Sequence, residues 1–539
     1  MKLFINLREL EAPPGTSVFE AAERAGILVP TSCKKQGRCR ECLVEVVGGM
    51  EYLTPRSEEE EPLGAEFRLA CRARALHGAG EIHCHTLRRA AMRIEDRAVE
   101  LPVYARSSPL DPAVTRDGDR ICLEGRELAR TRGPIHGVAL DLGTTTVALR
   151  LVDLESGKIL ATSSFENPQR FGGSDVMARI TYDATHTGRL LQRTLLGYLS
   201  HAIEEFPVDS TTIYEIVVAG NATMRDLFFG LDVQSIGQKP FRSQTQLELE
   251  AGERESTSLS LEARRLRLPI HPAARVHGLP LISGHVGADA AACLLAIDLP
   301  REQNLVALMD IGTNTELIVG NCERVFAASC PAGPAFEGGR ISCGMPGLNG
   351  AIESVRIAED GRVGVDVIGG GPPEGLCGSG LIELLGELLR RGTMNVRGRL
   401  SSGERFFSVD AERGIALHER DISELAQAKG ANTAGLRVLL RRCGVGADDI
   451  ELFYLAGAFG GHLPAEAARR IGLIPDIDDG RIRQVGNAAI EGATIALRSL
   501  TRRRELERLV RKIEHVPLES DPEFFDEFVL GCLFRSIDL

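Results

Sequence analysis

One short motif occurs twice in this chain, and it limits the fold more than any other feature of the sequence. The first copy is Asp141, Leu142, Gly143, Thr144, Thr145 and Thr146, and the second is Asp310, Ile311, Gly312, Thr313, Asn314 and Thr315. An apolar run precedes each copy and a β-branched run follows it, which predicts a buried strand, a tight turn and a returning strand. Two copies of one hairpin predict a duplicated α/β fold with a nucleotide bound between the halves.

The chemistry of the turn favours a phosphate ligand. Gly143 lets the backbone bend close to a ligand, and the threonine hydroxyls and turn amides form an anion-binding concavity. Asp141, at the end of a buried strand, could hold Mg²⁺ through water. One copy alone could be a structural hairpin, whereas two copies in the same setting favour a nucleotide site. The chain has no G-x-x-x-x-G-K-S/T loop, so it is not a P-loop NTPase.

Later glycines are candidates for binding the rest of the nucleotide, because a backbone without side chains can approach a ligand closely. The turn after a strand predicted over 453–456 could approach an adenine or a ribose. The nucleotide-binding glycines predicted outside the two motifs are Gly378, Gly380, Gly457, Gly460 and Gly461. The catalytic candidates are Asp141 and Asp310, with Asp289 and Glu316 as hypotheses for positioning the attacking water.

Four cysteines near the start of the chain predict an iron–sulfur cluster. Cys33, Cys39 and Cys42 follow a helix predicted over 17–25, and Cys71 lies further on. This C-x5-C-x2-C spacing with a distant fourth cysteine is close to the plant-type [2Fe–2S] pattern. Basic neighbours and backbone amides favour the thiolate form that binds iron. Zinc is the competing interpretation, but zinc sites usually pair two short knuckles, and only one is present here.

Length and composition set the domain plan and exclude some partners. We expect a small domain over 1–88, a linker or small middle segment over 89–136, and two halves over 137–303 and 304–539, with an exposed excursion at 242–268. The formal net charge of −12 argues against nucleic acid as a partner. No apolar run reaches the ~18 residues of a membrane span. Thirteen cysteines without an export signal favour metal ligands and buried thiols in a cytoplasmic protein.

Together these features resemble the ATP-dependent reductive activators of corrinoid proteins. That family joins an N-terminal [2Fe–2S] domain to an ATPase of the actin, sugar kinase and heat-shock chaperone superfamily. The resemblance rests on the four cysteines, the two motifs and residues 220–224 and 284–289. It implies a β-grasp-like ferredoxin domain followed by a duplicated, actin-like (ribonuclease H-like) two-lobed ATPase. It also implies that the four cysteines bind the cluster, that both loops embrace the phosphates of ATP with Mg²⁺, and that residues 457–461 hold the adenosine.

The family's task is the return of an oxidised Co(II) corrinoid protein to Co(I), with electrons from a low-potential donor passing through the cluster. Two features depart from the family. Arg40 stands where related loops often carry glycine, and segment 89–136 looks shorter than its counterpart in longer members, which leaves a homodimer inferred from that segment open. Two other functions stay open: a small-molecule kinase with a redox-sensing cluster, and an actin-like ATPase that serves as a scaffold.

Overall fold

The computed structural model describes residues 1–6, 8–78, 80–87, 101–102, 108–457 and 463–537. These residues form two compact units. One lies within Met1–Met92, Pro109–Asp289 and Ala496–Leu500, and the other within Arg93–Ser108, Ala290–Ile495 and Thr501–Leu539. Within the described ranges, every helix is too short or too polar to span a bilayer.

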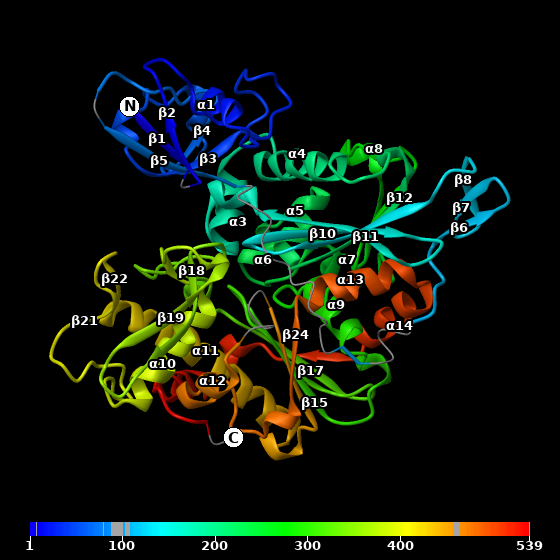
Figure 1. Cartoon of the computed structure of the whole chain (residues 1–539). Helices are drawn as coiled ribbons and strands as arrows, with labels where there is room; N and C mark the ends of the chain where they lie inside the picture. Colours follow the sequence, from blue (N-terminus) through cyan, green and yellow to red (C-terminus); the bar gives the residue numbers. More distant parts are fainter. Residues whose placement is uncertain (7, 79, 88–100, 103–107, 458–462, 538–539) are drawn as a thin grey trace. The chain divides into compact units, whose positions relative to one another are not determined.

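The first domain of the first unit is a mixed five-stranded sheet with one helix, the β-grasp arrangement that the resemblance implies (Figure 1). The strand order is β2-β1-β5-β3-β4, with β1 parallel to β5. The helix begins as the sequence predicts, because Ser17 and Glu20 form a capping box. The elements are β1 (Lys2–Ile5), β2 (Arg8–Glu11), α1 (Val18–Arg24), β3 (Leu43–Gly48), β4 (Phe67–Leu69) and β5 (Glu81–Thr86).

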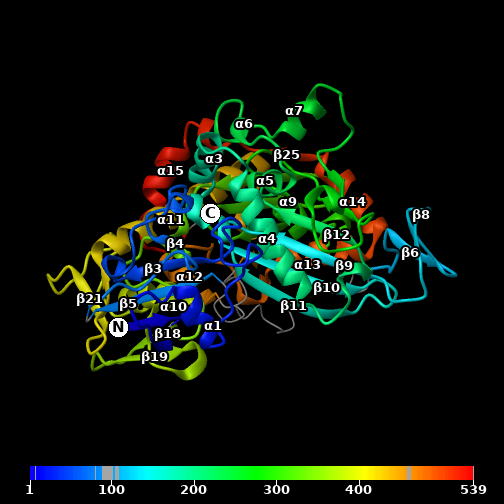
Figure 2. The same cartoon turned by 90° about the horizontal axis from the view of Figure 1, so that it is seen from above.

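The first motif lies in a six-stranded sheet of order β11-β10-β9-β12-β14-β13. Strands β9, β10 and β11 are antiparallel neighbours, whereas β12 and β14 continue from β9 as parallel strands. Helix α4 lies along one face of this sheet in both views (Figures 1 and 2). The strands are β9 (His136–Leu142), β10 (Thr146–Asp153), β11 (Ile159–Glu166), β12 (Ile213–Gly220), β13 (Leu259–Glu262) and β14 (Arg275–Gly278).

The helices that connect these strands carry several buried polar residues that reach the first motif. They are α3 (Val176–Thr185), α4 (Leu190–Glu204), α5 (Ala222–Phe229), α6 (Gln234–Gly237), α7 (Gln244–Glu250), α8 (Ala263–Leu266) and α9 (Ala288–Ala296), with the 3₁₀ segment η3 (Pro168–Gly172). A separate antiparallel meander precedes the lobe: β6 (Val114–Asp117), β7 (Arg120–Leu123) and β8 (Arg126–Arg130). In both views this meander lies beyond one end of the six-stranded sheet (Figures 1 and 2).

The second motif lies in the second unit, in a sheet of order β24-β23-β15-β16-β17-β25. Its strands are β15 (Val306–Asp310), β16 (Thr315–Gly320), β17 (Val325–Cys330), β23 (Leu452–Ala456), β24 (Ile482–Gly486) and β25 (Ile513–His515). Two smaller sheets are formed by β18 (Ala351–Ile357), β19 (Val363–Val367) and β20 (Gly375–Leu376), and by β21 (Phe406–Asp410) and β22 (Ile415–His418). The helices are α10 (Gly378–Arg390), α11 (Glu419–Cys443), α12 (Ala465–Ile471), α13 (Ala488–Arg498), α14 (Leu500–Val510) and α15 (Phe524–Gly531).

The two large sheets share a five-strand core, which confirms the duplicated fold. The order β11-β10-β9-β12-β14 in the first sheet corresponds to β17-β16-β15-β23-β24 in the second. In each sheet the motif strand pairs antiparallel with its hairpin partner and parallel with a strand that comes much later in the chain. Because parallel neighbours end at the same edge of a sheet, each motif meets another strand-to-helix turn there.

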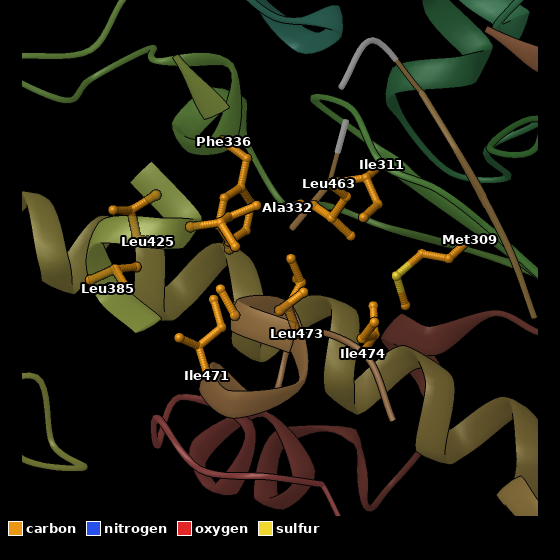
Figure 3. Packing of buried hydrophobic residues seen from close by; sticks show 14 of the residues in the cluster. Met309, Ile311, Ala332, Phe336, Leu385, Leu425, Leu463, Ile471, Leu473 and Ile474 are labelled. Atoms are coloured by element: carbon orange, nitrogen blue, oxygen red, sulfur yellow. The ribbon is translucent and has the colours of Figure 1, made fainter. Parts of the chain in front are cut away.

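The core of the second unit is a single apolar cluster built from both strands and helices. Figure 3 shows Met309 of β15 with Leu385 of α10, Leu425 of α11 and Ile471 of α12 among its members. All four side chains are almost fully buried. Strand β15 therefore has its apolar side fixed in the core, which sets the position of the motif at its end.

The exposed excursion expected at 242–268 is correct for many of its side chains, which are exposed, but wrong for others, which are buried. This stretch forms α7, then β13, which pairs antiparallel with β14 at the edge of the first lobe's sheet. Its polar residues are drawn inward by Arg225 of α5, which is fully buried. Arg225 donates to the carbonyl oxygen of Thr257 at 2.9 Å and to Thr245 Oγ1 at 3.0 Å. The polar composition reflects this buried network, which periodicity does not reveal.

Arg225→Met tests this correction. The change leaves three buried acceptors, on Thr245, Thr257 and Leu279, and the adjacent buried Asp226 carboxylate without their guanidinium. We therefore expect the free energy of unfolding to fall by about 3–5 kcal/mol. Limited proteolysis should then cut within 242–268. The control is Arg264→Gln, because the Arg264 side chain is 70% exposed and its ion pair with Glu262 should contribute little. Equal stability and equal cleavage in both variants would contradict the network.

Candidate functional site

The first motif forms a tight loop where a buried strand ends beside a parallel strand. Asp141 is the penultimate residue of β9 and is buried. Gly143 is required by the turn, because a Cβ there would lie 2.6 Å from the carbonyl oxygen of Thr146. Asn221, which follows β12 and caps α5, donates its Nδ2 to Thr144 Oγ1 at 3.0 Å. The loop is therefore held from the neighbouring strand-to-helix turn.

Two buried residues that the sequence analysis did not single out also hold this loop. Arg179 of α3 donates Nη2 to the carbonyl oxygen of Thr144 at 2.7 Å. Asn167 donates Nδ2 to the carbonyl oxygen of Gly143 at 2.9 Å and its backbone N–H to that of Thr145 at 2.7 Å. These carbonyls are thereby turned into the protein and away from any anion. Neither residue belongs to a recognisable motif, so only the fold identifies them.

Asp289 also lies near the turn that holds the first loop. It lies in the first turn of α9, and a Cβ on Gly287 would lie 2.5 Å from its Oδ1 and 2.4 Å from the Cα of Asn221. The glycine thus allows the carboxylate to approach the turn that holds Thr144. The structure brings Asp289 to the first loop, as its candidacy for water positioning requires.

In the second unit, Asp310 and Glu316 face each other across the motif hairpin. They are register partners in the antiparallel pair β15–β16, so their side chains lie on the same face. Burial raises the pKa of Asp310 to about 6, although the Cys293 thiol donates to its Oδ2 at 3.4 Å and acts in the opposite direction. Glu316 is buried and accepts from Ser329 Oγ at 3.3 Å. Two carboxylates are therefore held together at this strand end.

Glu337 is a further residue of the second loop that the sequence analysis missed. Its Oε1 accepts the backbone N–H of Thr313 at 3.1 Å, and its Oε2 accepts from Thr313 Oγ1 at 2.8 Å. It lies in the short helical segment η6 (Pro334–Glu337), within a glycine-rich stretch that carries no signal for this contact. The amide and the hydroxyl of Thr313 thus both donate to one carboxyl group.

The remaining glycine candidates occupy different positions. Gly457 has φ +107°, and a Cβ there would lie 2.2 Å from the carbonyl oxygen of Ile311, so Gly457 packs directly on the second loop. Gly460 and Gly461 lie outside the described residues. Gly378 is the first residue of α10, whereas Gly380 serves packing, because a Cβ there would lie 2.3 Å from the carbonyl oxygen of Ile352.

The remaining motif residues complete the two loops. Thr145 and Thr146 lead into β10, while Gly312 and Asn314 form the second turn and Thr315 is the first, buried residue of β16. A Cβ on Gly312 would lie 3.5 Å from Glu337 Oε1, which places this glycine beside the bound carboxylate. Both loops thus present small and hydroxyl-bearing residues at the carboxyl end of a buried strand.

The four predicted cluster cysteines come together as two pairs. Cys42 Sγ lies 3.4 Å from Cys71 Sγ, and the thiol of Cys33 is hydrogen-bonded to the backbone and side chain of Cys39. In a [2Fe–2S] cluster each iron takes two protein ligands, which suits paired thiols. Among the described residues, no three His, Cys, Asp or Glu side chains are placed to hold one metal ion.

The cluster loop lowers the pKa of one thiol in each pair, Cys33 and Cys71, while burial raises the pKa of Cys39. Burial acts to raise the pKa of Cys33, but bonds from the backbone and thiol of Cys39 and from the amides of Gln36 and Arg38 outweigh it and lower that pKa to about 7. The bond from Cys42 lowers the pKa of Cys71, while the same bond and burial raise that of Cys42. Iron bound by the thiolates of Cys42 and Cys71 would replace the proton of the hydrogen bond between them.

The cluster loop has a left-handed backbone at Arg40, which accounts for the glycine that related loops often carry at this position. Lys34, Lys35 and Arg40 have φ of 52°, 66° and 59°, a conformation that glycine adopts without strain. A non-glycine residue costs about 1–2 kcal/mol there. Arg40 gains a compensating contact, because its Nε donates to the carbonyl oxygen of Glu59 at 3.1 Å. The substitution keeps the loop shape.

Comparisons with known proteins match the whole arrangement. Residues 5–76 match the model of the 2Fe-2S iron-sulfur cluster binding domain. Residues 136–302 match the RACo middle region, and residues 304–539 match the C-terminal domain of RACo, the ASKHA domain. The three matches follow one another in the order of the domains described above.

Individual relatives agree with these matches. The chain is 32% identical over 431 residues to the corrinoid activation enzyme RamQ of Eubacterium limosum, covering 74% of this chain and 70% of that protein. It is 26% identical to the Co(II) methylated amine-specific corrinoid protein reductase of Methanosarcina barkeri, covering 74% and 76%. The solved structure of a reductive activator for corrinoid, iron-sulfur protein superposes with a TM-score of 0.72 at 27% identity, covering 100% of this chain and 99% of that one.

Cys39→Ala tests the cluster ligands. After anaerobic reconstitution with iron and sulfide, the wild-type chain should show the visible absorption and circular dichroism of a [2Fe–2S] centre, and the variant should lose them. Cys84→Ala is the matched control, because Cys84 is a buried thiol of the same domain on β5. A full spectrum in the Cys39 variant, or its loss in the Cys84 variant, would show that the ligands are different.

Asp310→Asn should stabilise the protein at neutral pH. A carboxyl whose folded pKa of about 6 exceeds its unfolded value binds its proton more tightly when folded, so stability falls as pH rises towards 6. Removing the buried charge should therefore raise the free energy of unfolding at pH 7 by about 3 kcal/mol, with no gain at pH 4. Denaturant titration at both pH values measures this, with the exposed Asp360→Asn as control. A loss of stability at pH 7 would contradict the burial argument.

Proposed function

The chain belongs to the family of reductive activators of corrinoid proteins, and we propose that it uses ATP to return an oxidised Co(II) corrinoid protein to the Co(I) state. One observation carries this proposal: a single chain combines paired cysteines in a ferredoxin domain with two phosphate-loop hairpins in a duplicated ATPase fold. The bound [2Fe–2S] cluster would supply a one-electron carrier. The corrinoid protein is the substrate, and a low-potential electron donor and a cytoplasmic setting belong to the same proposal.

In this proposal the two loops bind the phosphates of ATP. Asp141 and Asp310 hold Mg²⁺ through water, because carboxylate oxygens are the ligands that Mg²⁺ prefers. Asp289 and Glu316 orient the attacking water. Positioning and charge neutralisation are what phosphoryl transfer chiefly requires. The contact of Glu337 with Thr313 supports the anion-binding role of the second loop.

Energetics explain why an electron carrier needs an ATPase. The reduction potentials of plant-type [2Fe–2S] centres lie at about −400 mV. For each ~59 mV by which the potential of the cobalt couple lies below that of the cluster, the equilibrium constant for transfer of one electron falls by a factor of ten. ATP can offset such a deficit only if it binds two conformations of the protein unequally. Nucleotide turnover would then change the complex with the corrinoid protein or the ligation of its cobalt.

Reconstitution with a Co(II) corrinoid protein tests the proposal. We expect visible spectra to show Co(I) only when ATP, reductant and the cluster-loaded chain are all present. Phosphate release without any change at cobalt would favour a kinase or a scaffold ATPase instead. Sedimentation of the purified chain with and without the corrinoid protein would show whether a homodimer or a monomer forms the complex.

Asp141→Asn should impair the ATP-dependent step and leave the iron–sulfur cluster intact. Losing the carboxylate at the first phosphate loop should lower ATP-dependent Co(I) formation by about 100-fold or more, while the cluster spectrum stays unchanged. The control is Asp153→Asn at the other end of the hairpin, where the carboxylate accepts backbone N–H groups of its own turn. Normal Co(I) formation by the Asp141 variant would remove that residue from the ATPase machinery.

A further inference from the structure

One short segment of the first unit contacts both the phosphate loop and the ferredoxin domain. The segment runs from Glu166 through η3, and Asn167 caps its start. Asn167 is fully buried and makes the two bonds to the carbonyl oxygens of Gly143 and Thr145 described above. Any change in the position of the phosphate loop is therefore passed to the start of η3.

The other end of the segment holds the ferredoxin domain. Arg170 donates Nη2 to Glu45 Oε1 at 3.2 Å and Nη1 to Glu166 Oε2 at 2.9 Å. Its guanidinium also lies over the Phe67 ring, 5.9 Å from the centroid. The next residue, Phe171, accepts the backbone N–H of Gly64 at 3.0 Å. Three successive parts of the ferredoxin domain thus meet this short helical segment.

The strands that Arg170 contacts are the ones that carry the second cysteine pair. Glu45 and Phe67 are register partners in the antiparallel pair β3–β4. Cys42 immediately precedes β3, and Cys71 follows β4 by two residues. Only a few residues therefore separate the Arg170 contact from the thiols that would bind one iron.

The cluster loop has a second support on the first lobe. Glu41, which lies between Cys39 and Cys42, accepts from Nε2 of His201 on α4 at 3.0 Å and from Ser32 Oγ at 2.6 Å. A Cβ on Gly197 of α4 would lie 2.8 Å from the Glu41 side chain, so that glycine lets the helix approach. Tyr182 of α3 also donates its hydroxyl to the carbonyl oxygen of Pro62 at 2.7 Å, so the ferredoxin domain is seated on the lobe at several places. Of these, the Arg170 place combines contacts to the strands beside the cysteines with a bond to the phosphate loop from the same short segment.

We propose that Arg170 is a positioning residue that couples the nucleotide state of the first phosphate loop to the setting of the cluster-bearing strands β3 and β4. Its side chain is 26% exposed, and it lies between Glu45 and Glu166, whose side chains are 16% and 4% exposed. A largely desolvated guanidinium between two carboxylates fixes both partners in direction as well as distance. The proposal rests on the proposed function, because it requires nucleotide at the first loop.

The test compares the full-length, cluster-loaded wild type with Arg170→Met, which keeps much of the aliphatic stem and removes the charge, and Arg170→Lys, which keeps the charge. Arg74→Met is the control, because Arg74 belongs to the same domain and its side chain is 45% exposed. Three quantities are measured with a non-hydrolysable ATP analogue. They are its affinity by calorimetry, the change that it causes in hydrogen exchange of residues 40–46, and the change that it causes in the electron paramagnetic resonance signal of the dithionite-reduced cluster.

We expect the wild type and Arg74→Met to show a nucleotide-dependent change at residues 40–46 and in the cluster signal. Arg170→Met should bind the analogue within about threefold of wild type and show neither change, and its ATP-dependent Co(I) formation should fall roughly 10- to 100-fold. Arg170→Lys should recover part of the response. Should Arg170→Met fail to fold, Glu45→Gln removes the same ion pair from the other side and should show the same loss.

Two results would overturn the proposal. One is a wild type that binds the analogue without any change at the cluster strands, and the other is an undiminished response in Arg170→Met and Glu45→Gln. Failure of the proposed function gives a different result, because the wild type would then bind no nucleotide, or would release phosphate without any change at the cobalt of the corrinoid protein.

Discussion

A carboxylate at the buried end of a strand loses most of its hydration, and both halves of this protein contain one. Asp141 is the penultimate residue of β9 and Asp310 is the last residue of β15, each beside a parallel strand. Such a position is costly unless charge or hydrogen-bond donors are supplied. The loops, the turn after β12 and the nearby acidic residues are arranged around these two sites, and the raised pKa of Asp310 is the direct sign of that cost.

The ferredoxin domain meets a related problem with thiols in place of carboxylates. Four thiolates close together would repel one another, and hydrogen bonds within two pairs of thiols lower the pKa of Cys33 and Cys71 while raising that of Cys42. Backbone amides of the cluster loop stabilise the charge that remains, and the left-handed residues aim that backbone. The same arrangement is ready for two irons, because each pair can serve one of them.

The first phosphate loop and the cluster cysteines belong to one compact unit, in which the first lobe contacts the ferredoxin domain. Segment 166–172 has a buried amide on the phosphate loop and a guanidinium on the strands that carry cysteines. Helix α4 supports the cluster loop itself through His201. A domain that had only to deliver electrons would not need such contacts with an ATPase lobe, and a domain tethered by a flexible linker would not make them.

The sequence by itself determined the repeated hairpin, the capped helix, the four cysteines and the order of the domains, because these depend on local spacing and periodicity. It also pointed to the acidic residues at both strand ends. Only the tertiary structure revealed Asn167, Arg179 and Glu337 at the loops, and the ordered course of 242–268. These depend on contacts between residues far apart in the chain, where a polar side chain is drawn inward by a buried partner, and no local pattern records which partner the fold will supply.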